Sequence, residues 1–288
     1  MDSQPSRRSS VSRSQPESWV GLHASAIAWS EADTRGILHW RYRRWDGSVE
    51  SLKAVLVADV PCRQPQLLLG PSLARHWLQA PSTGASYLQE LHAIARARAV
   101  QLFSMQTPVP HHTSNTETGW HVSGDWQASR PFLCAAWPAS LSLLSLPLRT
   151  PLITALSAYR TQLPRTGWLA ITLANELHLM SIQEGHLGGL RSRRLLPDTN
   201  FRDMQDRVTQ EWQRDQLRDQ AFTKGDQRLH WLHLMPSPVA TSAHKSIALI
   251  TLPKPSRTPA AALQALCLEE QEACFSAWVG MHVSGDIA

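Results

Sequence analysis

Two stretches of this chain read as copies of one another, and this repetition constrains the fold more than any other feature. The first runs from Trp19 to Trp45 and the second from Trp168 to Arg194, at a constant offset of 149 residues. In both, an apolar run that begins at tryptophan passes through small residues into a second apolar run. A polar turn that ends in glycine then leads into a third run that ends in arginines. Such reversals between short apolar runs are typical of antiparallel hairpins. The pattern predicts two three-stranded meanders, each opening one half of the chain; chance resemblance between unrelated meanders is the alternative.

The other segments alternate between strand-like and helix-like patterns. We expect strands over Ser48–Val60, Gln66–Gly70, Phe132–Trp137, Arg228–Met235 and Ser246–Leu252. We expect helices over Ser86–Phe103, Thr150–Gln162, Asn200–Phe222 and Thr258–Trp278, with a short amphipathic turn over Leu73–Leu78. This order predicts an α/β fold with a mixed sheet in each half. The halves are expected to span residues 19–164 and 165–288, after a disordered tail over residues 1–18.

Membrane insertion and secretion are not expected. The longest apolar runs, such as Phe132 to Trp137, are far shorter than the roughly 20 residues that a spanning helix needs. The stretch from Met1 to Ser18 is rich in serine, arginine and glutamine and has no apolar centre, so it does not read as a signal peptide. We therefore expect the protein in the cytoplasm.

The charge distribution argues against a nucleic-acid partner, and the cysteine spacing argues against a metal site. The 28 Lys and Arg exceed the 23 Asp and Glu by only five, and no basic stripe runs along a predicted helix. The four cysteines form no C-x-x-C pair, and His111-His112 stand in a loop rich in Pro, Thr and Ser. We expect no metal site and no nucleic-acid partner. The folded part has two local arginine clusters. One contains Arg41, Arg43 and Arg44, and the other contains Arg191, Arg193 and Arg194; both also fit a solvated strand face.

The repeated meanders resemble a known superfamily. Val20 to Ser25 (VGLHAS) stand where the actin-like ATPases have their first phosphate loop, and Ala170 to Asn175 (AITLAN) where the second would be. Gln66 to Pro71 (QLLLGP) is similar to the strand of that family which ends in a glycine-containing turn. Within the superfamily the chain most resembles the PilM-like and GspL-like cytoplasmic platform proteins of type IV pilus and type II secretion systems. The resemblance implies an actin-like fold of two ribonuclease-H-like lobes that clasp a nucleotide.

The two loops depart from the active members of that family. His23 stands where the family has a metal-linked aspartate, and Ala24 or Ser25 where it has glycine. The second loop, with Thr172 and Ala174, has neither the acidic residue nor the glycine of the family. Without that carboxylate and those glycines, Mg-ATP loses its metal ligand and its backbone cradle. The substitutions predict a pseudo-enzyme with no bound cofactor. Two alternatives stay open, an active nucleotide-dependent enzyme such as a sugar kinase and a ribonuclease-H-type nuclease, for which the first meander offers only Glu31 and Asp33.

The expected function is a catalytically silent scaffold or adaptor that works by binding. In the family that the chain resembles, the soluble member is recruited by a short cytoplasmic segment of a single-span inner-membrane protein. For this contact we predict Trp40, Arg41, Arg44 and Trp45, with the two tryptophans partly exposed because arginines flank them. A homo-oligomer is also compatible with the sequence.

One pentapeptide, His-Val-Ser-Gly-Asp, occurs twice, at His121–Asp125 and at His282–Asp286. Neighbours this close in sequence rarely converge as a catalytic triad. We therefore predict two similar turns or a coincidence.

Overall fold

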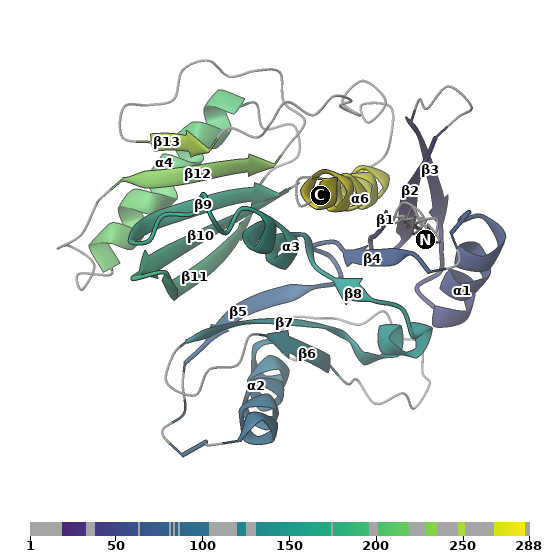
Figure 1. Ribbon diagram of the computed structural model, residues 1–288, viewed down its shortest axis with the longest axis horizontal. Helices are drawn as coiled ribbons and strands as arrows, with labels where there is room; N and C mark the ends of the chain where they lie inside the picture. Colours follow the sequence, from purple (N-terminus) through teal and green to yellow (C-terminus); the bar gives the residue numbers. More distant parts are fainter. Residues whose placement is uncertain are drawn as a thin grey trace, which may run out of the picture.

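The structure is a computed structural model. It describes residues 19–32, 38–62, 64–80, 82, 84–85, 87–103, 120–124, 131–173, 175–195, 201–218, 228–234, 247–250 and 268–285. Two five-stranded sheets and one three-stranded sheet form its framework, with helices on their faces (Figure 1).

The first five-stranded sheet is mixed. It contains β1 (Trp19–Leu22), β2 (Ala26–Ala32), β3 (Leu38–Arg44), β4 (Gln66–Leu69) and β8 (Leu148–Arg149). The order is β3-β2-β1-β4-β8, with antiparallel pairing along β1-β2-β3 and parallel pairing along β1-β4-β8. The first meander predicted from the sequence therefore forms one side of this sheet.

The second five-stranded sheet repeats this plan. It contains β9 (Gly167–Leu173), β10 (Glu176–Gln183), β11 (His186–Arg194), β12 (Leu229–Leu234) and β13 (Ile247–Ile250). The order β11-β10-β9-β12-β13 has the same sequence of antiparallel and parallel pairs as the first sheet. The predicted second meander and the α/β class are confirmed, and the chain contains two mixed sheets with the same strand plan.

The prediction of a strand over Ser48–Val60 is wrong, because this segment forms helix α1 (Val49–Ala58). Ser48 caps the helix, since its Oγ accepts from the amide of Ser51 over 3.1 Å. Val49, Leu52 and Leu56 are buried at helical spacing against the first sheet. The β-branched residues had favoured a strand, but the cap and this spacing decide for the helix.

A smaller antiparallel sheet is inserted between β4 and β8. It contains β5 (Arg75–Gln79), β7 (Phe132–Pro138) and β6 (Trp120–Gly124) in the order β5-β7-β6, and a 3-10 helix (Ala139–Leu144) follows β7. Helix α2 (Leu88–Phe103) packs on it through Leu91, Ala95 and Ala99. The helix and the strand at Phe132 are confirmed. The amphipathic turn expected over Leu73–Leu78 is wrong, since β5 begins at Arg75 and pairs with β7.

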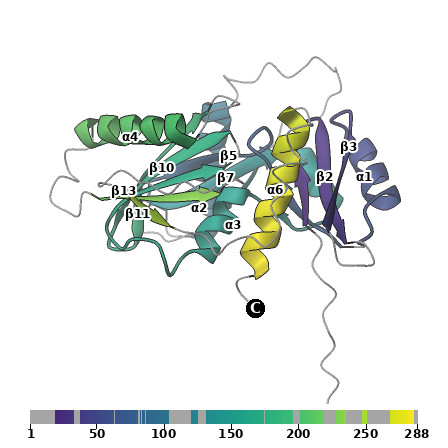
Figure 2. The same cartoon turned by 90° about the horizontal axis from the view of Figure 1, so that it is seen from above.

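Two helices lie between the five-stranded sheets. Helix α3 (Pro151–Ala158) begins at Thr150, whose hydroxyl accepts from the amide of Ile153, and confirms the predicted helix. Helix α6 (Leu268–Gly285), drawn in yellow, runs between the first-lobe strands and α3 (Figure 2). Its Cys274 face packs on β2, and its Trp278 face packs on α3 and β9. Both lobes therefore share α6 as a packing partner.

Helix α4 (Phe201–Arg218) covers the other face of the second sheet. Met204, Val208 and Trp212 recur at intervals of four residues and are buried against β9 and β10. This stripe confirms the surface helix predicted from the same residues.

Some expectations fall outside this description or stay open. The tail over residues 1–18, the Ser86 cap and the start of the last helix at Thr258 lie outside the described residues. The division at residues 164 and 165 stays a prediction. Among the described helices, none is both long enough and apolar enough to cross a membrane.

Candidate functional site

The turn between β1 and β2 and the turn between β9 and β10 meet at one side chain of α6. Nε2 of His23, in the first turn, lies 3.4 Å from Oε2 of Glu272. Nδ2 of Asn175, in the second turn, donates to Oε1 of the same carboxylate over 3.1 Å. Glu272 is only 7% exposed, and its Oε2 accepts no well-formed hydrogen bond from the described residues. A buried carboxylate therefore occupies the point between the two turns.

The backbone amides of the first turn are already used within the protein. The amide of His23 donates to the carbonyl of Ala26 over 2.8 Å, and the amide of Ser25 donates to Nδ1 of His23 over 3.2 Å. The amide of Ala24 donates to Oγ of Ser72 over 3.0 Å. An anion-binding turn needs such amides free to point at the anion. This turn offers none of these three to a ligand.

Acidic side chains of α6 and the cation of Arg194 both act on the first turn. Burial is the main cause that lowers the pKa of His23 below its ordinary value; Glu272 and Glu269 raise this pKa, and Arg194 lowers it. The ring is therefore mainly neutral at pH 7 and does not cancel the carboxylate beside it. A phosphate at this point would meet negative charge and not a cradle of donors.

A second polar cluster lies at the start of β10. Oε2 of Glu176 lies 3.3 Å from Nε2 of His178, whose Nδ1 lies 2.8 Å from Oγ of Ser192. The ring of His76, from the inserted sheet, packs edge-on against His178 at 5.6 Å between centroids, and its Nε2 lies 2.8 Å from Oγ1 of Thr150. A protonated Glu176 can donate to His178, which then donates to Ser192. The edge-on contact between His76 and His178 joins the inserted sheet to the second lobe.

The Glu176→Gln variant should change the pH dependence of stability in a defined direction. Burial raises the pKa of Glu176 from 4.5 to about 7, against the opposing effect of Arg75 and Arg194. The unfolded chain loses this proton near pH 4.5, so the group costs the wild type stability as pH rises from about 4.5 to 7. At about 1.4 kcal/mol per pKa unit, the cost is on the order of 3 kcal/mol. Because glutamine does not titrate, the stability of the variant relative to wild type should rise by that order between pH 4.5 and 8 in urea unfolding.

The neighbouring histidine serves as an internal control for this measurement. Burial lowers the pKa of His178 to about 4, so its contribution to stability is lost as pH falls from 6.5 to 4, the opposite direction. Both proteins contain His178, and the difference between them therefore reports Glu176. A difference that does not change with pH would contradict the assignment.

Of the predicted loop residues, Thr172 lies away from the turn surface. Its Oγ1 lies 2.7 Å from Nδ1 of His233 and accepts from Nε1 of Trp231 over 3.1 Å. Both partners belong to β12, so Thr172 ties two strands of the second sheet together. Ala174 lies outside the described residues.

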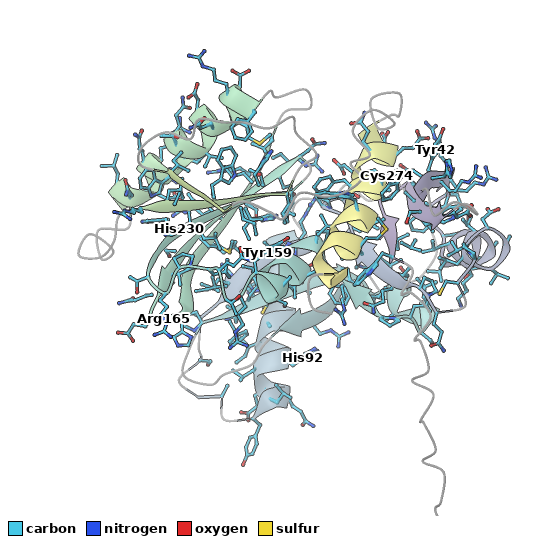
Figure 3. All side chains as sticks on the ribbon, turned by 45° about the horizontal axis from the view of Figure 1, so that its top comes forward. Tyr42, His92, Tyr159, Arg165, His230 and Cys274 are labelled. Carbon is cyan, nitrogen blue, oxygen red and sulfur yellow. The ribbon has the colours of Figure 1, made fainter. Side chains whose placement is uncertain are left out.

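The four residues predicted to bind a partner lie at or near β3, the edge strand of the first sheet. Arg41 pairs with Glu31 at 3.2 Å, and Arg44 pairs with Glu270 of α6 at 3.5 Å. Trp40 is partly buried against the cluster that includes Cys274, and Tyr42 of the same strand is 42% exposed. Figure 3 labels Tyr42 and Cys274.

The expected exposure of Trp45 is wrong. Trp45 is 7% exposed and belongs to the core of the first lobe. Its Nε1 donates to the carbonyl of His23 over 2.9 Å, so the indole is buried with its polar atom satisfied. Trp45 follows the end of β3, and the side chains of Arg43 and Arg44 before it are largely exposed.

Sequence reasoning did not find Glu272, Glu176 or His76. One signal was available for Glu272. The residues that follow it, from Ala273 to Gly280, are apolar except for Ser276 and so place apolar residues on every side of the helix. A helix that is apolar all round is buried. An acid at the start of such a run therefore needs a partner elsewhere in the fold.

The described part of the chain also bears on the possible metal ligands and on the repeated pentapeptide. No group of three or more His, Cys, Asp or Glu side chains in that part is placed to hold a metal ion. The repeated pentapeptide does not form two similar turns, because its first four residues lie in β6 at one copy and in α6 at the other. The two Asp residues that end it lie outside the described residues.

Comparison with known proteins gives structural likenesses only. No family model and no curated protein matches the chain. One similar solved structure is a Bacteroides thetaiotaomicron protein with an actin-like ATPase fold and unknown function, at 9% identity and a TM-score of 0.43, covering 81% of this chain and 90% of that one. Another is the cytoplasmic domain of EpsL, an inner membrane component of the type II secretion system of Vibrio cholerae, at 12% identity and 0.43, covering 94% and 93%.

A third is the PilM-PilN type IV pilus biogenesis complex, at 12% identity and a TM-score of 0.42, covering 94% of this chain and 98% of that one. Such identities and scores do not assign a family. The strand order and the contacts described above stand without them.

Proposed function

We propose that this chain is an actin-like scaffold that does not hydrolyse nucleotide, working at the cytoplasmic face of the inner membrane in a type IV pilus or type II secretion machine. The observation that supports the lack of nucleotide hydrolysis is that the Glu272 side chain occupies the space between the two turns. Glu272 fills it from α6, and the amides of the first turn are bonded within the protein. Both features disfavour a triphosphate, the first by charge and the second because the amides of His23, Ala24 and Ser25 already donate within the protein.

The test is thermal unfolding with and without saturating Mg-ATP and Mg-ADP. A ligand at about 100 times its Kd would stabilise the folded protein by about 2.7 kcal/mol, which is a rise of several degrees in Tm. We expect no rise for the wild type. We also expect none for Glu272→Gln, which removes the charge but leaves the three turn amides bonded.

An active actin-like ATPase measured in the same buffer is the positive control. A ligand-dependent rise in the Tm of the wild type would overturn the proposal and favour the nucleotide-dependent enzyme. A rise in Glu272→Gln alone would show that charge by itself closes the site.

The scaffold is proposed to bind a short cytoplasmic segment of an inner-membrane protein along β3. No described strand pairs with the outer edge of this strand. An extended segment can add to such an edge through backbone hydrogen bonds, and its side chains then meet both faces of the strand. Arg41 and Arg44 project from opposite faces, with side chains 60% and 73% exposed. Acidic residues in the segment would complement them.

Charge reversal of Arg41 and Arg44 together to glutamate should abolish co-purification with the membrane partner. Because each reversed side chain would face Glu31 or Glu270, the milder Arg41→Gln/Arg44→Gln pair is measured beside it and should weaken binding without repulsion. Circular dichroism and Tm report the fold of both variants.

The matched control reverses two exposed arginines of α4, Arg202 and Arg207, which should leave binding unchanged. Full binding by the folded glutamine pair would place the partner elsewhere. Equal loss in the α4 control would show a general charge effect and not a site.

A further inference from the structure

The polar cluster at the start of β10 places one imidazole ring between a carboxyl group and a hydroxyl group. Glu176 and His178 share a face of β10, and Ser192 of β11 lies directly opposite His178 in the strand register. Oε2 of Glu176 lies 3.3 Å from Nε2 of His178, and Oγ of Ser192 lies 2.8 Å from Nδ1 of the same ring. Each ring nitrogen therefore faces one partner.

The ring of His178 stays neutral near pH 7. It is 1% exposed, and burial lowers its pKa to about 4. The ring of His76, which packs edge-on against it, is also neutral, because burial lowers the pKa of His76 well below its ordinary value. A neutral imidazole carries one N–H, and its other nitrogen accepts. His178 can therefore donate to only one of its two partners at a time.

The proton on Glu176 decides which partner that is. A protonated Glu176 donates to Nε2 of His178, so Nδ1 carries the ring hydrogen and donates to Oγ of Ser192. An ionised Glu176 can only accept, so Nε2 carries the hydrogen and Nδ1 accepts from the hydroxyl of Ser192. Both arrangements satisfy the two ring nitrogens, and the second contains one proton fewer.

Ser192 carries this difference to the surface of the protein. The residue is exposed, and no described strand pairs with the outer edge of β11. In the first arrangement the hydroxyl hydrogen of Ser192 is free to donate outward. In the second arrangement that hydrogen points at His178, and only oxygen lone pairs remain for an outside group.

The charged groups around Glu176 come from three other elements. Arg75 of β5 and Arg194 of β11 favour the ionised carboxylate, and Glu272 of α6 favours the protonated form. Burial has a larger effect than any of them and raises the pKa of Glu176 to about 7. The exchange between the two arrangements therefore falls near neutral pH.

We propose that Glu176, His178 and Ser192 form a pH-sensitive switch, in which ionisation of the carboxyl group moves the ring hydrogen of His178 from Nδ1 to Nε2. The same change turns the Ser192 hydroxyl from an outward donor into an outward acceptor. The switch lies within the hairpin of β10 and β11 and does not depend on the function proposed above.

The test reads the tautomer of His178 from two-bond 1H–15N correlation spectra of the full chain labelled with 15N-histidine. The variant His178→Gln assigns the ring resonances. Since one pH unit on either side of a pKa gives a tenfold excess of one form, we expect Nδ1–H at about pH 6 and Nε2–H at about pH 8. The ring should not become doubly protonated within this range.

His233 is the internal control in the same spectra. Its ring is buried, with a pKa lowered to about 4, and its Nδ1 lies 2.7 Å from Oγ1 of Thr172. That oxygen accepts from Trp231, so its hydrogen is directed at Nδ1 and the ring hydrogen stays on Nε2. His233 should keep this tautomer at every pH of the series.

Two variants test the two ends of the switch. Glu176→Gln should hold His178 in one tautomer at every pH, because glutamine does not titrate. Ser192→Ala should keep the tautomer change but move the Nδ1 resonance, because the hydroxyl is the partner of that nitrogen. A tautomer change that persists in Glu176→Gln, or an unmoved Nδ1 resonance in Ser192→Ala, would overturn the proposal. The wild-type spectra alone would do so if His178 became doubly protonated near pH 7 or kept one tautomer throughout.

Discussion

Gly21→Ala is expected to unfold the protein or to detach α6 from the first sheet. A Cβ at residue 21 would lie 1.8 Å from the carbonyl oxygen of Ala273 and 2.7 Å from the amide nitrogen of Ala277. Both atoms are helix backbone, so no side-chain rotation relieves the clash. The helix would have to move by more than an ångström along a packed face, which places the cost among the exceptional ones, above about 4 kcal/mol.

The control for this variant is Gly84→Ala, where a Cβ would meet nothing within 4 Å. Urea unfolding of both variants gives the comparison. We expect Gly84→Ala to unfold like the wild type and Gly21→Ala to unfold at much lower denaturant. Similar midpoints for the two would show that α6 does not pack on β1 as described.

Trp278→Ala is expected to cost about 3 to 5 kcal/mol of unfolding free energy. The indole is 1% exposed and packs in a cluster with Leu152 of α3 and Leu169 of β9. Phe275 lies beside it at 5.5 Å between ring centroids. Since these neighbours come from three different elements, they cannot all move together to fill the space, and the full cavity cost applies.

Leu217→Ala on α4 is the matched surface control, because Leu217 is 80% exposed. Its unfolding free energy should stay within about 0.5 kcal/mol of the wild type. A loss of less than about 1 kcal/mol for Trp278→Ala would mean that α6 contributes little to joining the lobes.

The duplicated architecture was predictable because each antiparallel strand pair forms between segments that are close in the sequence. Each hairpin is closed within a few residues, so tryptophan, small residues and arginines at matching positions define it without long-range information. Helix α1 was not predicted, because Val49, Val55 and Val57 fit a strand equally well. The Ser48 cap and the spacing of Leu52 and Leu56 favour the helix once the first sheet offers a face that buries these leucines.

Of the candidate site, the sequence predicted the first turn but not the side chain of α6 that meets it. His23 and the small residues beside it marked the first turn as unsuited to phosphate. The group that fills the space, Glu272, comes from a helix almost 250 residues further along the chain. No spacing rule links such positions, because the contact arises from tertiary packing of α6 between the lobes. The same holds for His76 and His178, which meet only because the inserted sheet folds against β10.

The place of α6 also has a consequence for synthesis on the ribosome. The face of β1 and β2 that carries Gly21 and Ala28 is covered by a helix whose residues follow β8 by more than a hundred positions. At roughly 5 to 20 residues per second, this apolar face stays open for on the order of ten seconds after β8 has been made. The nascent first sheet is then a substrate for chaperones. Slowing translation after residue 150 should increase aggregation, because it lengthens the interval before the sheet is closed.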